Sequence, residues 1–249
     1  MSVVQAERGA SLEALFHPAL ARDARAVLLV PGIPGLGGGM DHAVMAELSF
    51  VFSQAGLSVL RFNFRGVGVS TKINEGLSTL WLEDTTAKEA ELFRRCGAQD
   101  VRSALRQLDA SVEPEEVYVV GVGFGACALN SFLEEEAAAF VEEKIDVNDD
   151  KQMTSILERI EKVAFVAAPF LTPYAFSSIG QLGFPAPSRT SAGILPLEVF
   201  AAEEDGALSD DVIVSAQAEN VFPQRIAGAD IGFSRGLSSL GRSVVARML

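Results

Sequence analysis

Five short, almost uninterrupted apolar runs constrain the fold of this chain more than any other feature of its sequence. They are rich in β-branched residues, and longer amphipathic segments separate one run from the next. The runs occupy residues 25–32, 57–64, 115–122, 161–169 and 195–202. Strands that are apolar on both faces are typical of a parallel sheet covered by helices on each side. The sequence therefore predicts an α/β fold with a buried, mostly parallel sheet.

The segments between these runs carry helix signals. Residues 41–56 are predicted to form a helix that begins after a capping Asp41. Residues 85–108 are predicted to form a second helix, because Thr86 and Glu89 have the spacing of a capping box. Further helices are expected after Gly125 and over residues 234–249, and an opening hairpin over residues 3–17.

The order of these elements predicts one α/β domain over residues 1–249, with helices on both faces of the sheet and no internal repeat. Residues 171–194 are rich in proline, glycine and serine, which favours a loop at the carboxyl edge of the sheet, where such folds bind ligands. This loop is too short to be a large lid. Residues 134–160 are expected to form an acidic helix end and an inserted loop.

The formal net charge of −13 excludes nucleic acid as a partner, because a phosphate backbone would be repelled. Residues 134–150 hold eight acidic residues and one lysine, a composition typical of a solvated helix end. Residues 146–150 begin like a calcium-binding loop. However, Lys151 and Leu157 occupy the positions that require glycine and glutamate, so no metal site is expected.

The cysteine content and the lack of a long apolar run bear on the compartment. Two cysteines, Cys96 and Cys127, are too few for a disulfide framework and indicate a reducing environment. No apolar run approaches the roughly 20 residues that span a membrane, and no signal peptide is recognisable. We therefore expect an intracellular protein, cytoplasmic by default, with an organelle such as the mitochondrion left open.

A glycine motif follows the third predicted strand. Gly121, Gly123 and Ala126 have the spacing of a dinucleotide-binding fingerprint between a strand and a helix. A true fingerprint is followed by a second strand that ends in an acid about 20 residues further on. At that distance this chain has only its acidic segment. Nucleotide binding is therefore a minor alternative, and no cofactor is expected.

A second motif gives the glycines another interpretation. Residues 61–70 read Arg-Phe-Asn-Phe-Arg-Gly-x-Gly-x-Ser, and Met40 and Asp41 precede the intervening helix. Together with the Gly-x-Gly-x-Gly turn at 121–125, this order resembles the small lidless members of the α/β-hydrolase superfamily. The resemblance implies a single-domain α/β-hydrolase fold without a large lid.

The resemblance also assigns the positions of a catalytic triad. It places Gly123 at the nucleophile position, Asp205 at the acid position and Ile231 at the base position. The backbone N–H groups of Ile33 and Phe124 fall at the positions that form an oxyanion hole. An acid without an imidazole to orient has no catalytic role, and loss of the nucleophile removes on the order of 10⁶ in turnover. No catalytic residue is therefore assigned.

Other side chains could supply relocated chemistry or an anion contact. His17 is expected at the surface near the hairpin and His42 at a helix start, while Cys127 is expected in the core. Arg61 and Arg65 end a strand, where they either hold neighbouring loops or contact a ligand.

We therefore expect a catalytically inactive protein that acts as a scaffold, a subunit of a protein assembly or a ligand-binding module. Its partners would be other protein subunits or a small acyl or ester ligand. The protein contact is expected at the carboxyl edge of the sheet or at residues 134–150. The alternative is a carboxylesterase-type hydrolase with relocated catalytic residues.

Overall fold

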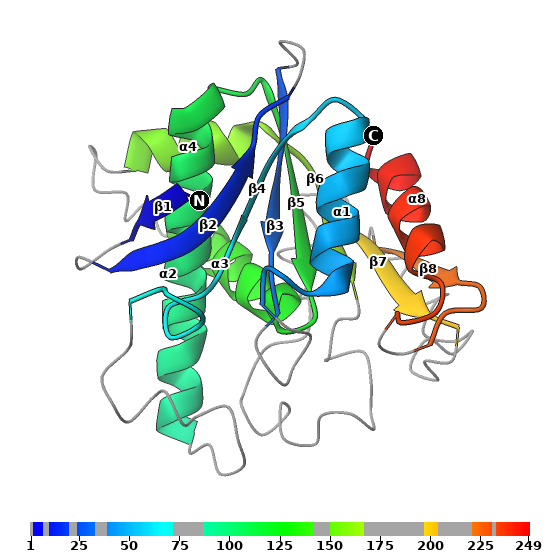
Figure 1. The fold of residues 1–249 in the computed structure, drawn as a ribbon. Coiled ribbons are helices and arrows are strands. Elements are labelled where there is room, and N and C mark those ends of the chain that lie inside the picture. Colours follow the sequence, from blue (N-terminus) through cyan, green and yellow to red (C-terminus); the bar gives the residue numbers. More distant parts are fainter. Residues whose placement is uncertain are drawn as a thin grey trace.

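The computed structural model describes residues 2–6, 10–19, 24–32, 39–71, 87–141, 150–166, 197–203, 221–230 and 233–249. Eight strands form one sheet in the order β1-β2-β4-β3-β5-β6-β7-β8 (Figure 1). The strands are β1 (Ser2–Gln5), β2 (Ser11–His17), β3 (Arg25–Val30), β4 (Ser58–Phe62), β5 (Glu116–Val122), β6 (Ile160–Val166), β7 (Leu197–Ala202) and β8 (Val221–Ile226). The hairpin β1–β2 pairs antiparallel to β4, and the strands from β4 to β8 in this order run parallel.

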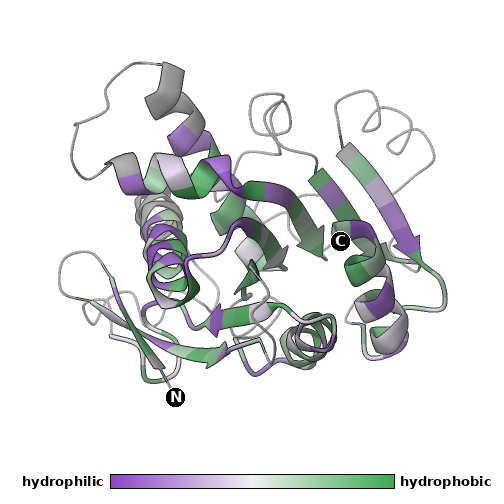
Figure 2. Cartoon of the chain, turned by 90° about the horizontal axis from the view of Figure 1, so that it is seen from above, coloured by the Kyte–Doolittle hydropathy of each residue, from purple (hydrophilic) through white to green (hydrophobic). Residues whose placement is uncertain are grey.

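Helices cover both faces of the sheet. They are α1 (Ala43–Gln54), α2 (Ala87–Val112), α3 (Phe124–Val141), α4 (Asp150–Glu158) and α8 (Leu237–Met248). Helices α2, α3 and α4 pack on one face and α1 and α8 on the other, as Figure 2 shows from above. None of the described helices is long and apolar enough to cross a membrane.

The alternation of side chains along the central strands divides the apolar interior into two cores. On β3, Leu28 packs into the core under α2 and α3, whereas Val27 and Leu29 pack into the core under α1 and α8. Successive residues of a strand point to opposite faces, so a strand covered on both sides must be apolar throughout. This confirms the interpretation of the five apolar runs.

The predicted fold class is confirmed, with local corrections. The five predicted strands and the opening hairpin are present, and the described residues form one domain without a separate lid. Asp41 was wrongly predicted as the N-cap of α1. His42 takes that place, and its Nδ1 accepts a hydrogen bond from the Val44 N–H at 3.4 Å. Two elements were not predicted, namely β8 and the helix α4, which lies inside the range expected to be a helix end and a loop. Residues 171–194 lie outside the described residues.

Candidate functional site

The turn between β5 and α3 is the centre of the candidate site. Gly123 is the one residue between the strand and the helix, and its φ of 56° lies in the left-handed region. Its N–H donates to the carbonyl of Val166, at the end of β6, at 2.8 Å. Glycine adopts this backbone without strain, whereas other residues pay on the order of 1–3 kcal/mol. The predicted strand–turn–helix is confirmed, and no side chain projects from its central residue.

The glycines on either side of Gly123 are required by close packing. A Cβ on Gly121 would lie 2.7 Å from the Cα of Ala126, so the helix could not fold back onto the strand. A Cβ on Gly125 would lie 2.3 Å from the carbonyl oxygens of both Val30 and Pro31. These contacts hold the start of α3 against the carboxyl end of β3. Close packing therefore explains the two flanking glycines, whereas the left-handed backbone explains Gly123.

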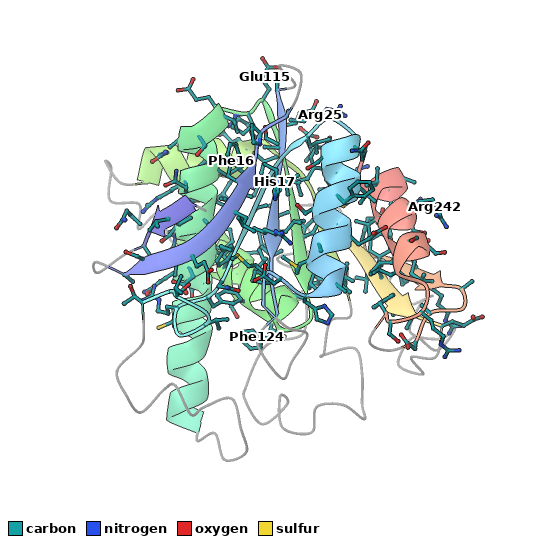
Figure 3. All side chains as sticks on the ribbon, viewed as in Figure 1. Phe16, His17, Arg25, Glu115, Phe124 and Arg242 are labelled. Carbon is teal, nitrogen blue, oxygen red and sulfur yellow. The ribbon has the colours of Figure 1, made fainter. Side chains whose placement is uncertain are left out.

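Phe124 fixes the first turn of α3 at the carboxyl edge of the sheet (Figure 3). Its ring is buried and lies edge-to-face with that of Phe64, with 6.1 Å between the centroids. Backbone N–H groups at the start of a helix have no intrahelical acceptor, which is why this position suits an oxyanion hole in a hydrolase. Ile33, the other predicted oxyanion-hole residue, lies outside the described residues.

The segment that follows β4 is tied to its neighbours through Asn63. The Asn63 side chain accepts the Met40 N–H at 2.8 Å and donates to Glu13 Oε2 at 2.9 Å. Its backbone N–H donates to the Glu13 carbonyl at 2.8 Å. One asparagine therefore joins the segment before α1 to β2. Glu13 was missed by the sequence analysis, because nothing local marks a residue 50 positions away as its partner.

The two strand-end arginines hold neighbouring segments. Arg61 Nη1 donates to the Met40 carbonyl at 2.9 Å. Arg65 Nε lies 2.7 Å from Asp100 Oδ1, and the Arg65 N–H donates to Asp100 Oδ2 at 3.0 Å. Both members of this ion pair are buried, and Asp100 belongs to α2. The structure thus supports the loop-holding role that the sequence analysis weighed against ligand contact.

Asp205 and Ile231, the predicted acid and base positions, lie outside the described residues. Their flanking segments are nevertheless joined. The Gly228 N–H, after β8, donates to Glu203 Oε2, after β7, at 2.6 Å. Asp230 accepts bonds from the Ser234 hydroxyl and the Arg235 N–H, and the Ser234 bond is the main reason that its pKa is lowered. Asp230 therefore joins the segment after β8 to the residues just before α8.

The remaining candidate side chains do not form a second catalytic pair in the described part of the chain. His17 lies at the end of β2 and is mostly exposed. Its remaining partial burial and the Arg61 charge lower its pKa. Neither His17 nor His42 bonds to a described serine or cysteine. Cys127 is fully buried, and this burial raises the pKa of its thiol and keeps it protonated. No group of three or more described His, Cys, Asp or Glu side chains is placed to hold a metal.

Solved structures share this architecture over nearly the whole chain. A lidless α/β serine hydrolase from Xanthomonas campestris superposes with a TM-score of 0.61 at 18% identity, covering 100% of this chain and 94% of that one. An α/β serine hydrolase homologue from Coxiella burnetii gives 0.59 at 17% identity, covering 100% and 96%. The chain has the α/β-hydrolase fold.

A third similar structure is Est1E from Butyrivibrio proteoclasticus with bound ferulic acid, with a TM-score of 0.66 at 12% identity, covering 100% of this chain and 98% of that one. No protein-family model matches the chain, and no curated protein is significantly similar to it in sequence. At these identities the structural likeness establishes the α/β-hydrolase fold, and function has to be argued from the residues of the site.

Proposed function

We propose that this chain is a catalytically inactive α/β-hydrolase-fold protein that acts by binding. The observation that carries the proposal is Gly123 in the turn between β5 and α3, with a φ of 56° and no side chain. A hydrolase of this fold presents its nucleophile from that turn. The side chain of Gly123 is a single hydrogen atom, so this residue cannot act as a nucleophile. No neighbouring group among the described residues replaces the missing hydroxyl.

The other triad positions support the same proposal. The residue at the base position is Ile231, so no imidazole is supplied there, and an acid at Asp205 would have nothing to orient. We infer a role as a scaffold, a subunit of a protein assembly or a module that binds a small acyl or ester ligand. The contact is proposed at the carboxyl edge of the sheet or at residues 134–150, where a partner with a basic surface would fit.

The alternative is a carboxylesterase-type hydrolase with relocated catalytic residues. It is favoured by the similar structures, which include serine hydrolases and an esterase with bound ferulic acid. This alternative needs a nucleophile and a base that the described residues do not bring together. The two proposals differ in whether the folded protein reacts with an acyl substrate.

Labelling with a fluorophosphonate probe separates the two proposals. We expect the folded protein to remain unlabelled and activated esters to hydrolyse no faster than with heat-unfolded protein, because both readouts need an activated nucleophile. A lidless serine hydrolase of the same fold serves as the positive control. Stoichiometric labelling of one serine, mapped by mass spectrometry and lost on unfolding, would establish the hydrolase alternative instead.

A further inference from the structure

Arg61 of β4 is a half-buried cation that forms no ion pair with a carboxylate in the described part of the chain. Its Nη1 group donates to the Met40 carbonyl, whereas its Nε–H is buried and has no acceptor. By comparison, Arg65 and Arg159 lie 2.6 Å and 2.7 Å from a carboxylate oxygen. A guanidinium carries five N–H groups, so the bond to Met40 uses only part of the hydrogen-bonding capacity of Arg61.

The alternation along β4 determines which side chains share a face of the sheet with Arg61. Leu60 packs into the core under α2 and α3, so its neighbour Arg61 points to the face that carries α1. In the antiparallel register, Leu15 of β2 lies opposite Arg61, and His17 lies opposite Val59. Residues opposite each other lie on the same face, and so do residues two apart on one strand. Leu15 and His17 therefore flank Arg61.

This part of the sheet face can be reached from solvent. Helix α1 packs against β3 and β4, whereas on β2 Leu15 is half-buried and His17 is exposed. The Nη2 group of Arg61 has no described acceptor and is not fully buried, so it is the donor that a ligand can reach. A charged donor, an imidazole and an apolar side chain thus lie next to one another between α1 and the outer part of β2.

The electrostatics around Arg61 favour an anion, although the chain as a whole is acidic. Partial burial and then the Arg61 charge lower the pKa of His17, so the positive charge of Arg61 acts on its neighbour without being offset. Glu13 is the acidic residue on the same face of β2. Its Oε2 accepts the Asn63 side-chain amide and the Val69 N–H and does not pair with Arg61. An anion beside Arg61 would therefore meet an uncompensated cation.

We propose that Arg61, His17 and Leu15 form a binding site for a small monocarboxylate with an apolar body. The carboxylate accepts hydrogen bonds from Arg61 Nη2 and from the imidazole N–H of His17, and the apolar body lies on Leu15. A phosphate dianion fits less well, because one guanidinium cannot balance two charges in a chain with a net charge of −13. The site is independent of the proposed function, because β3 separates β4 from β5 and the Gly123 turn.

The first test is a titration with sodium butanoate, followed through the imidazole signals of the protein by NMR at about pH 8, where a histidine is neutral. The chain has only two histidines, and His42 serves as the internal reference because it caps α1. We expect a saturable shift of the His17 signals with a dissociation constant of about a millimolar. Butan-1-ol, which has the same apolar body without the charge, and chloride at equal ionic strength should give no saturable shift.

The second test measures the same titration in variants. Arg61→Gln removes the charge but keeps an amide that can donate to Met40, and it should weaken butanoate binding about tenfold to a hundredfold. Arg242→Gln is the matched control, because it removes the same charge from an exposed position on α8 that lies far from His17 (Figure 3). Leu15→Glu places a carboxylate opposite Arg61 and should abolish binding, whereas Leu15→Gln should still bind.

The Leu15 pair keeps the proposal testable if Arg61→Gln fails to fold, since circular dichroism shows which variants retain the native structure. The proposal would be overturned by the absence of a saturable His17 shift, or by an equal shift with butan-1-ol or chloride. Wild-type affinity for butanoate in a folded Arg61→Gln or Leu15→Glu chain would overturn it as well.

Discussion

Gly123 holds a backbone conformation that a serine in the same turn would have to hold under strain. An active hydrolase accepts that strain because the turn exposes its nucleophile. Glycine relieves it, and the flanking Gly121 and Gly125 are still demanded by the contacts with Ala126 and the end of β3. The motif can therefore persist for packing reasons after its chemical reason has gone. This explains why a glycine signature alone is poor support for catalysis.

Restoring the triad side chains tests the assigned positions. Gly123→Ser alone should not hydrolyse activated esters, because no imidazole takes the hydroxyl proton. Gly123→Ser combined with Ile231→His should gain weak turnover, because Asp205 and the Phe124 N–H complete the set. Each change should also lower the free energy of unfolding, the serine by on the order of 1–3 kcal/mol through strain.

The comparison of the single and double variants, with activity and urea unfolding measured on the same preparations, is the decisive one. Equal activity in the two would show that Ile231 is not the base position. Gly66→Ser is a matched control for strain, because Gly66 has a φ of 86° and open space where a Cβ would be added. Gly66 lies outside the turn between β5 and α3.

At the scale of elements, the segment after β4 is bonded to three other parts of the fold. Its Asn63 contacts β2 and the segment before α1, and its Arg65 contacts α2. The sequence analysis recognised the motif but not its partner Asp100. A signal was available, because Asp100 lies four residues from Ala104 and eight from Leu108, on the apolar face of the helix. A carboxylate on such a face indicates a buried ion pair.

We expect Asp100→Ala to lower the free energy of unfolding by about 3–5 kcal/mol, because it removes the buried carboxylate that lies 2.6 Å from the buried Arg65 guanidinium. Replacing both residues, with Asp100→Leu and Arg65→Met, should cost less than the single change, since no buried charge remains. Urea unfolding measures both. If the double variant were the less stable one, the ion pair itself would be a net source of stability.

The elements that were not predicted have identifiable physical causes. β8 reads Val-Phe-Pro-Gln-Arg-Ile, and a proline argues against a central strand. The structure puts it at an edge, where proline is tolerated, and edge position is not visible in a local sequence. Helix α4 was hidden by the surrounding acidic residues, although Met153 and Ile156 are buried at helical spacing. By contrast, the apolar runs were sufficient to predict the central strands, because helices cover both faces of these strands.

At the scale of the whole molecule, ionic contacts join elements that are distant in sequence. Arg159 in the turn before β6 lies 2.7 Å from Asp109 of α2, and Arg247 of α8 lies 3.0 Å from Glu198 of β7. Arg102 of α2 pairs with Glu136, so part of the acidic segment is neutralised within the molecule. The two cores that these contacts surround are built from apolar side chains. A group that must ionise inside those cores will therefore oppose folding.

Two such groups are the Cys127 thiol and the Tyr118 hydroxyl, and we predict that the protein loses stability at alkaline pH because of them. Burial raises the pKa of the Cys127 thiol above its usual 9.0, and burial followed by the bond to Glu116 raises the pKa of Tyr118 from 10.0 to about 12. Above the ordinary values, the unfolded chain loses these protons while the folded chain keeps them. The free energy of unfolding should then fall with rising pH, beginning near pH 9 for Cys127 and near pH 10 for Tyr118.

Urea unfolding at a series of values from about pH 8 to about pH 11 would measure this loss, with a slope of about 1.4 kcal/mol per pH unit for each proton. Tyr118→Phe should flatten the slope above pH 10 and Cys127→Ala the slope above pH 9, each by one proton, even if each variant is less stable overall. If each substitution changed the free energy of unfolding equally at every pH and left the slope unaltered, the fold would not be holding the two side chains neutral. A cavity left where alanine replaces the Cys127 side chain lowers the free energy of unfolding equally at every pH. It therefore cannot produce the predicted change of slope.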